Sequence, residues 1–352
     1  MKINRVGVDL AKNVFQLHGV DGCGGGIWKR QLQRSNWLRV LMEQIDTDCE
    51  IGMEACGGAH HWARELKSRG YQVKLIPPQF VKPYVKGHKN DATDAAAVCE
   101  AMSRADMSYV AVKTVEQQDI QAVHRVRASV IGQRTAAGNQ IRGLVAEYGL
   151  VAPKQLGPLR RAIPDWLEDA ENGLTTRFRT LLHGLWEELL RLDQRIEVLD
   201  KEVKLIAETH VDAKRLMQLR GVGPLVATAL VARFGDASHF KRGRQAAASI
   251  GLTPRHHGTG GKNRIYGLSK QGDRYLRSIL IHGARAVVSQ AKQRDDRLSL
   301  WVTDLKERSH MNVAAVALAN KTVRVAWSML KDGTDYDPEL AVTERYRGWV
   351  MT

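Results

Sequence analysis

The first hundred residues alternate between short apolar runs and amphipathic segments, and this order limits the chain to few folds. Three runs with the two-residue period of a β-strand come first, and a glycine-rich turn over residues 21–26 separates the second from the third. Three helical segments then alternate with two further strands. The order β-β-β-α-β-α-β-α predicts an α/β layer domain that begins with an antiparallel meander. The expected strands are residues 3–9, 14–20, 27–32, 50–55 and 71–76, and the expected helices are residues 37–44, 60–69 and 91–102.

The charge balance predicts a polyanionic partner. The chain has 352 residues, with 53 Lys and Arg against 38 Asp and Glu, which gives a formal net charge of +15. Such an excess is typical of proteins that bind nucleic acid or an anionic membrane surface. No apolar run approaches the roughly 18 residues of a membrane span, so no membrane role is expected. Asp9 and Lys12 interrupt any signal-peptide core, which favours an intracellular protein. The four cysteines lack metal-ligand spacing and fit a reducing compartment: Cys23, Cys49, Cys56 and Cys99.

Four carboxylates occupy positions from which they could converge. Asp9 and Glu54 interrupt otherwise apolar strand sequence, and Asp91 and Asp94 are three apart at the start of a helix, so they share one face. Like charges in contact repel, and two divalent cations about 4 Å apart would neutralise them and could activate a nucleophile on a phosphodiester. Mg²⁺ or Mn²⁺ is expected because the ligands are hard oxygens. Taken singly, Asp91 or Asp94 could equally be a first-turn acid favoured by the helix dipole, and Glu54 could pair with a surface lysine.

The middle of the chain is helical. Residues 115–148 and 174–208 lack strand signals, and the second segment carries apolar residues spaced 4, 3, 4, 3, 4, 3. This heptad seam fits either a helical hairpin within one chain or a coiled coil between two chains, and the sequence leaves both open. Residues 151–164 contain three prolines and are expected to be a linker. The seam residues are Leu185, Leu189, Leu192, Ile196, Leu199, Val203 and Ile206.

From about residue 212 the chain is basic and punctuated by glycine. Residues 219–230 have the pattern of a helix-hairpin-helix turn, in which Gly221 and Gly223 would let backbone N–H groups face a phosphate. An ordinary glycine-rich turn is the alternative, but the basic residues that follow favour contact with DNA. These residues are Lys241, Arg242 and Arg244.

A second C-terminal motif surrounds Ser269. A loop with Gly258, Gly260 and Gly261 leads to residues 262–274, and a helix is expected over 271–288. Ser269 would then be the N-cap of that helix, although a helix N-terminus among cations also suits a bound phosphate and an attacking hydroxyl. Ser249 and Ser278 lie in apolar helical patterns and are weaker candidates. A last helix is expected at 311–330 and a tail from 335. The cations around Ser269 are Lys262, Arg264, Lys270 and Arg274.

Three motifs together resemble the DEDD transposases of insertion sequences, in the 110/1111 group. They are Val-Gly-Val-Asp-Leu-Ala-Lys (6–12), Gly-Met-Glu-Ala-Cys-Gly (52–57) and Lys-Asn-Asp-Ala-Thr-Asp-Ala (89–95), and the resemblance extends over essentially the whole chain. It implies an RNase H-like N-terminal domain similar to the RuvC Holliday-junction resolvase. The resemblance also implies that the metal-binding tetrad is Asp9, Glu54, Asp91 and Asp94. The matching Leu-Ser-Lys-x-Gly stretch makes Ser269 the family's proposed nucleophile.

The resemblance carries further expectations about organisation and partners. Family members act with a structured element-encoded guide RNA, the bridge RNA, which pairs with donor and target DNA. They form a composite site across a homodimer and assemble a tetramer for strand exchange. A cytoplasmic, nucleoid-associated prokaryotic enzyme is therefore expected. The expected divisions are a RuvC-like domain at 1–110, a helical coiled-coil region at 111–210, a C-terminal transposase domain at 211–335 and a tail at 336–352.

Two other functions fit parts of the sequence. A RuvC-like structure-specific nuclease would use water as nucleophile and leave Ser269 as a cap. A non-enzymatic DNA-binding protein would use the helix-hairpin-helix alone, but four correctly spaced acids argue against it.

Overall fold

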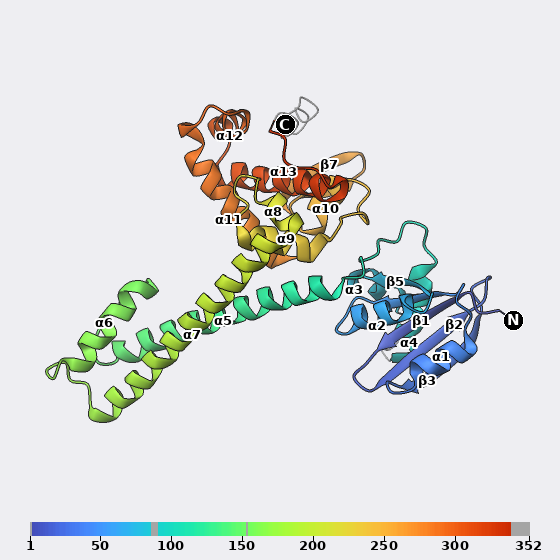
Figure 1. The fold of residues 1–352 in the computed structure, drawn as a ribbon, viewed down its shortest axis with the longest axis horizontal. Helices are drawn as coiled ribbons and strands as arrows, with labels where there is room; N and C mark the ends of the chain where they lie inside the picture. The colour runs from blue at the N-terminus through green and yellow to red at the C-terminus, as the bar shows by residue number, and fades with distance from the viewer. Residues whose placement is uncertain (1, 86–90, 153, 339–352) are drawn as a thin grey trace. The chain divides into compact units, whose positions relative to one another are not determined.

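The computed structural model describes residues 2–85, 91–152 and 154–338, with the side chains of residues 91, 92 and 263 excepted. The chain divides into two compact units, Met1–Thr114 and Val115–Thr352 (Figure 1). The finer division at residues 210 and 335 stays a prediction.

A five-stranded mixed sheet forms the centre of the first unit, in the order β3-β2-β1-β4-β5. The pairs β1–β2 and β2–β3 are antiparallel, whereas β1–β4 and β4–β5 are parallel. The predicted meander and all five strands are confirmed, and the topology is compatible with an RNase H-like domain. The strands are β1 (Arg5–Leu10), β2 (Val14–Val20), β3 (Gly26–Gln33), β4 (Glu50–Glu54) and β5 (Gln72–Ile76).

One face of this sheet packs on α1 (Trp37–Gln44) and α2 (Ala59–Lys67). The alternation of β1 sends Val6 and Val8 into this core, where neither side chain is exposed. Three aromatic rings fill its centre edge to face, with centroids 5.0 to 5.6 Å apart. These rings belong to Phe15, Trp37 and Trp62.

The opposite face carries α4 (Asp91–Met102), which lies directly on two glycines. A Cβ added to Gly7 of β1 would lie 2.2 Å from the backbone oxygen of Ala95, and one added to Gly52 of β4 would lie 2.0 Å from the Met102 sulfur. The helix therefore approaches the sheet as closely as the missing side chains allow. The short segments α3 (Pro78–Val81) and η1 (Lys82–Tyr84) precede it.

The second unit begins with a long antiparallel helical hairpin. Arg127 pairs with Asp200 and Arg134 with Asp193, so α5 (Val115–Ala146) and α7 (Thr176–Thr209) run in opposite directions. The heptad seam of α7 packs in cis, because Leu192 and Ile196 share one buried cluster with Val130 of α5. Whether the hairpin also pairs two chains stays a prediction.

The expected linker over residues 151–164 is wrong for most of its length. Residues Leu156–Glu168 form α6, whose Leu159 and Ile163 are fully buried against α5 and α7. Pro158 lies in the first turn, where a proline removes no needed N–H, whereas Pro164 lies inside the helix and removes one intrahelical hydrogen bond. The free energy gained by burying the apolar face of α6 thus outweighs the tendency of the two prolines to break a helix.

A helical module with a small β-hairpin completes the second unit. Its core is built around α9, which is buried along most of its length, and the alanine-rich face of α13. Where a glycine-rich loop was expected, β6 and β7 form an antiparallel hairpin, which is a correction. No helix within the described ranges is long and apolar enough to cross a membrane. The elements are α8 (Val211–Leu216), α9 (Pro224–Phe234), α10 (Gly243–Ser249), β6 (Pro254–Thr259), β7 (Lys262–Leu268), α11 (Arg274–Gln290), η2 (Ala291–Gln293), α12 (Arg297–Arg308) and α13 (Met311–Asp332).

Candidate functional site

Asp9 and Glu54 lie at the same edge of the first unit's sheet. The parallel register of β1 and β4 pairs Val8 with Met53, so the two acids follow at the next position of each strand. Asp9 is two residues beyond Gly7, so it lies on the face that α4 covers, and the same spacing places Glu54 beyond Gly52. Both side chains are half-buried.

Helix α4 lies on the sheet beside these acids. A Cβ on Gly7 would lie 2.2 Å from the Ala95 oxygen and 2.9 Å from the Cys99 nitrogen, and the Met102 sulfur lies over Gly52. Helix α4 therefore passes over Gly7 and Gly52, each of which precedes one of the two acids by two residues. Asp94 is half-buried in the turn before Ala95. The side chain of Asp91 lies outside the described residues.

The thiol of Cys56 lies near these acids, and their negative charge affects its pKa. The pKa of Cys56 is raised, first by burial and then by the negative charges of Glu54 and Asp9. The negative charges of Asp9 and Glu54 therefore both affect the same thiol, that of Cys56. Within the part of the chain that the structure describes, however, no three His, Cys, Asp or Glu side chains form a group that could hold a metal ion. The donor set consists of hard carboxylate oxygens, which suits Mg²⁺ or Mn²⁺.

Ser269 lies in the second unit, between β7 and α11. Its N–H donates to the Thr253 oxygen at 2.9 Å, and its side chain is half-buried. The expectation that Ser269 caps the following helix is wrong. The N-cap is Asp273, whose carboxylate accepts the Leu276 N–H at 2.9 Å, because the helix begins four residues later than a cap at Ser269 requires.

The segment that follows Ser269 is held by backbone packing. A Cβ on Gly251 would lie 2.1 Å from the Gln271 oxygen, and a Cβ on Gly272 would lie 2.1 Å from the Ser249 oxygen. The two chain segments therefore touch through glycine. Lys270 has a φ of 55°, which is the left-handed region that a non-glycine residue rarely adopts. Ser269 thus begins a tightly fixed turn, here called the Ser269 loop (residues 269–273).

A buried arginine ties this loop to its neighbour. Arg277 of α11 donates from Nη1 to the Ile250 oxygen at 2.7 Å and to the Gln271 oxygen at 3.3 Å. Nothing in the sequence pattern singles this arginine out, because a basic residue one turn into a helix is ordinarily solvated.

The glycine turn near residue 221 packs within the unit. Helices α8 and α9 flank it, and Gly221 has a φ of 81°. A Cβ on Gly283 of α11 would lie 2.0 Å from the Gly221 oxygen, so close packing accounts for this glycine. Gly223 is the N-cap of α9 and has open space around it. Phosphate binding here stays a prediction.

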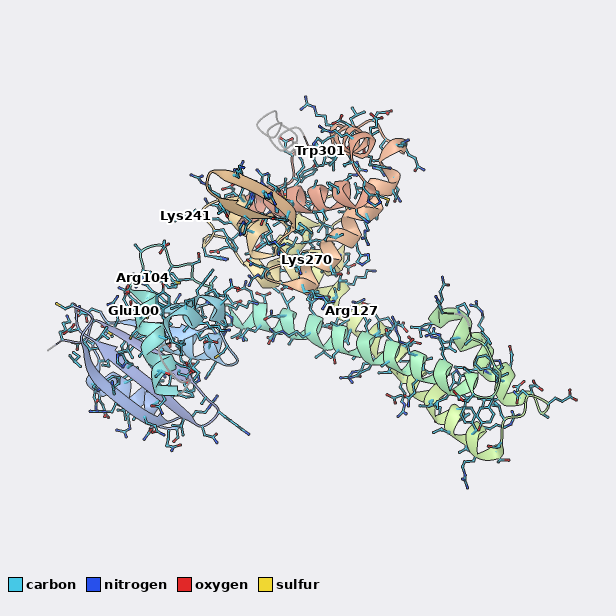
Figure 2. The ribbon with its side chains drawn as sticks, turned by 180° about the vertical axis from the view of Figure 1, so that it is seen from behind. Glu100, Arg104, Arg127, Lys241, Lys270 and Trp301 are labelled. Carbon is cyan, nitrogen blue, oxygen red and sulfur yellow. The ribbon has the colours of Figure 1, made fainter. Side chains whose placement is uncertain are left out.

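The predicted DNA-binding cations all have exposed side chains in the second unit, and Figure 2 labels two of them. Three surround the start of α10, two lie on β7, and two border the Ser269 loop. The residues at the start of α10 are Lys241, Arg242 and Arg244. Those on β7 are Lys262 and Arg264, and those at the Ser269 loop are Lys270 and Arg274.

Comparisons with known proteins connect both sites to one family. Residues 6–150 match the family model of DEDD transposases, described as "Transposase", and residues 213–299 match "Transposase IS116/IS110/IS902 family". A "Probable family 20 transposase" of Pseudomonas aeruginosa is 46% identical over 96% of this chain and 100% of its own. The chain belongs to the IS110/IS1111 family of insertion-sequence transposases.

Other relatives agree with this assignment. The "Transposase for insertion sequence element IS1111A" of Coxiella burnetii is 44% identical over 93% of this chain and 90% of the relative. The "Transposase for insertion sequence element IS1328" of Yersinia enterocolitica is 36% identical over 94% and 98%. The protein is therefore a DNA transposase, and the hypothesis of a non-enzymatic DNA-binding protein is wrong.

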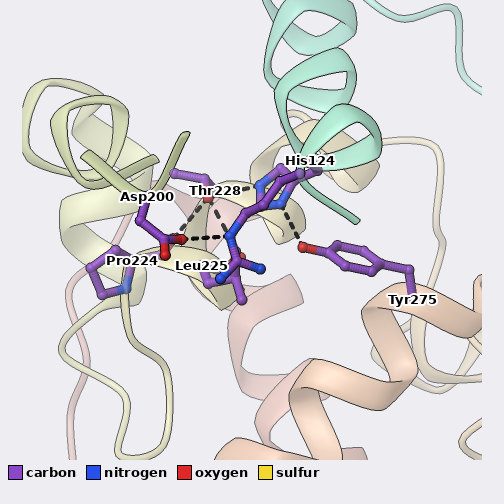
Figure 3. Close-up of polar contacts among 7 residues, drawn as sticks. His124, Asp200, Pro224, Leu225, Thr228 and Tyr275 are labelled. Carbon is purple, nitrogen blue, oxygen red and sulfur yellow. Dashed lines mark hydrogen bonds and ion pairs between the residues drawn. The ribbon is translucent and has the colours of Figure 1, made fainter. Parts of the chain in front are cut away.

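The transposase also contains a buried polar network that the sequence did not reveal (Figure 3). His124 of α5 contacts the Tyr275 hydroxyl through Nδ1 at 3.0 Å and the Thr228 hydroxyl through Nε2 at 2.9 Å. Thr228 donates to the Pro224 oxygen at 2.8 Å, so its hydroxyl accepts from His124 Nε2, and Nδ1 accepts from Tyr275. Two features of the sequence could have indicated this network. They are a histidine among the buried positions of α5 and a threonine within the apolar α9.

Proposed function

We propose that this transposase breaks and rejoins donor and target DNA with Ser269 as nucleophile, assisted by divalent metal at Asp9, Glu54, Asp91 and Asp94. The observation that carries the proposal is the fixed Ser269 loop. The half-buried Ser269 has its backbone fixed by a hydrogen bond to Thr253, and exposed Lys270 and Arg274 border the same loop. Preorganised cations beside a hydroxyl favour attack on a phosphate.

The proposed cleavage and rejoining of the DNA strand need no external energy source. The Ser269 oxygen attacks phosphorus and forms a phosphoserine ester, while the bond from phosphorus to the leaving deoxyribose oxygen breaks. The serine proton leaves to solvent and the leaving oxygen gains one. A hydroxyl of the partner strand reverses these steps and rejoins the DNA. Bond energy is thus conserved, which hydrolysis by water would lose.

The carboxylates at the sheet edge would hold a divalent cation that stabilises the negative charge of the phosphate. A bound Mg²⁺ or Mn²⁺ would supply a Lewis acid for the phosphate oxygens. The contribution of the chain is to hold Asp9 and Glu54 at adjacent strand ends, where their mutual repulsion favours cation binding. Both acids lie within residues 6–150, the segment that the DEDD family model matches.

Guidance by an element-encoded RNA and assembly of a homodimer into a tetramer complete the proposal. The net charge of +15 suits two nucleic-acid partners, and a DNA transposase is expected to work at the nucleoid. Because the heptad seam of α7 packs on α5 in the same chain, contacts between subunits would use other surfaces.

Trapping a covalent intermediate tests the proposal. The purified transposase, a DNA duplex bearing the element end, the guide RNA and Mg²⁺ should give a protein–DNA adduct that resists SDS. Ser269→Ala should abolish the adduct. Ser278→Ala is the matched control, because Ser278 is an exposed serine on α11 of the same unit. Adduct formation by Ser269→Ala would overturn the proposal.

A RuvC-like nuclease that uses water is the second candidate, favoured by the adjacent placement of Asp9 and Glu54 alone. It predicts cleavage by Ser269→Ala at the parental rate, with no adduct from the parent protein. The same experiment therefore decides between the two.

A further inference from the structure

The hairpin of β6 and β7 has no buried face. Every described side chain from Arg255 to Tyr266 is exposed, including the apolar Ile265 at 52% and Tyr266 at 40%. A two-stranded hairpin is marginal by itself, and one that packs neither face gains little from burial. Exposed apolar and aromatic side chains on such a ribbon indicate a surface that binds something else.

The register of the hairpin separates two chemically different faces. His257 pairs with Arg264 and Thr259 with Lys262, so these four side chains share one face. Tyr266 follows Arg264 by two residues, at the start of a register irregularity, and contacts Arg255 of the paired strand. The other face carries His256 opposite Ile265.

The first face concentrates positive charge. The Arg255 guanidinium lies over the Tyr266 ring, 5.2 Å from its centroid, and so joins Lys262 and Arg264. Among the residues that the structure describes, no carboxylate forms an ion pair with these three cations. We call Arg255, Lys262, Arg264 and Tyr266 the basic ribbon face.

The base of the hairpin adjoins the Ser269 loop. Strand β7 ends at Leu268, and the Ser269 N–H donates to the Thr253 oxygen, one residue before β6 begins. The base of the hairpin therefore lies next to Ser269.

We propose that the basic ribbon face binds the duplex DNA that flanks the phosphodiester attacked by Ser269, outside the stretch that pairs with the guide RNA. The inference rests on the proposed function for the identity of Ser269. A two-stranded ribbon fits the major groove of B-form DNA, which is about 12 Å wide, whereas the deep and narrow major groove of an RNA helix excludes it. The cations contact phosphates and position the duplex without reading its sequence.

The experiment measures binding of the full-length protein to a fluorescently labelled DNA duplex by anisotropy over a range of salt concentrations. The combined variant Arg255→Gln, Lys262→Gln and Arg264→Gln should bind at least about tenfold more weakly at physiological salt. Its slope of log affinity against log salt should become shallower by about 2 to 3, because each lost phosphate contact removes about 0.9.

Two matched controls accompany this variant. His256→Gln alters the opposite face of the same hairpin and should leave affinity and slope unchanged. Arg264→Lys keeps the charge and should retain most of the affinity. Since all these side chains are exposed, the thermal midpoint should stay that of the parent. Should the combined variant unfold, Arg264→Gln alone should still reduce the slope by about 1.

The outcomes are distinct from those of the adduct experiment. Unchanged duplex binding by the charge variants overturns the ribbon proposal, as does a loss confined to a labelled RNA stem-loop probe. Absence of an adduct from the parent protein overturns the nucleophile proposal and leaves the binding result intact. Ser269→Ala should bind duplex DNA as the parent does while forming no adduct.

Discussion

The Nη1 atom of Arg277 lies 2.7 Å from the backbone oxygen of Ile250, across the base of the Ser269 loop. The side chain is only 9% exposed. Replacing it with alanine would leave buried carbonyl oxygens without a donor, at a cost of about 2 kcal/mol. We expect Arg277→Ala to lower the thermal midpoint and the rate of adduct formation, and Arg277→Lys to restore part of both. Arg285→Ala, on an exposed position of the same helix, should change neither. Equal midpoints for the alanine variants would refute the role of Arg277.

Protonation of His124 should destabilise the second unit. Burial and then the charge of Arg127 lower the pKa of His124 from 6.5 to about 4. The unfolded chain therefore binds the proton more readily than the folded one. Stability contributed by neutral His124 is complete above about pH 6.5 and declines toward pH 4, by a total of about 3 kcal/mol. Thermal unfolding at several pH values should show this slope in the parent protein. His124→Gln should unfold at lower temperature but lack this component of the slope; an identical slope in both proteins would exclude His124 as its source.

The carboxylates at the sheet edge should control the reactivity of a thiol. Because Glu54 and Asp9 raise the pKa of Cys56 beyond the effect of burial, Glu54→Gln should lower that pKa. Alkylation of Cys56 near neutral pH should then become faster, since the thiolate is the reactive form. Site-resolved mass spectrometry can follow it, with the exposed Cys23 as an internal reference. A Cys56 rate that does not change, while the protein stays folded, would show that the acids do not face it.

Close packing of α4 on β1 should make Gly7 intolerant of any side chain. A Cβ there would lie 2.2 Å from the Ala95 backbone oxygen, which cannot rotate away. Gly7→Ala should therefore cost about 1 to 3 kcal/mol. Gly132→Ala is the control, because that glycine of α5 has open space around it and alanine favours a helix by about 1 kcal/mol. Denaturant unfolding should move in opposite directions for the two variants.

Periodicity predicted the elements of this transposase well because most of them bury one face. Strand β2 alternates between half-buried and buried positions, whereas β1 and β4 each have three consecutive buried residues, and the seam of α7 has a period that only a helix satisfies. Its partner could not be predicted, since apolar positions do not say whether the facing helix belongs to the same chain. The prolines of residues 151–164 predicted a linker where α6 forms, because the burial of Leu159 and Ile163 stabilises the helix.

The candidate sites were predictable to different degrees. Asp9 and Glu54 stand out in the sequence because they interrupt apolar strands, and their pairing follows from the parallel register of β1 and β4. The surroundings of Ser269 depend on contacts that leave no local pattern. Gly251, Gly272 and Arg277 meet only after the chain folds. The hairpin between Gly251 and Gly272 has exposed side chains on both faces, so it lacks the burial signal of a strand.

The exposed hairpin has a consequence for the history of such elements. Substitutions in a helix like α9 must satisfy a crowded interior, whereas residues 254–268 contribute almost nothing to the core. Variation in this ribbon can therefore accumulate at nearly constant stability. It is the segment in which a mobile element can adjust its proposed contact with DNA phosphates while Ser269 at the base of the hairpin stays in place.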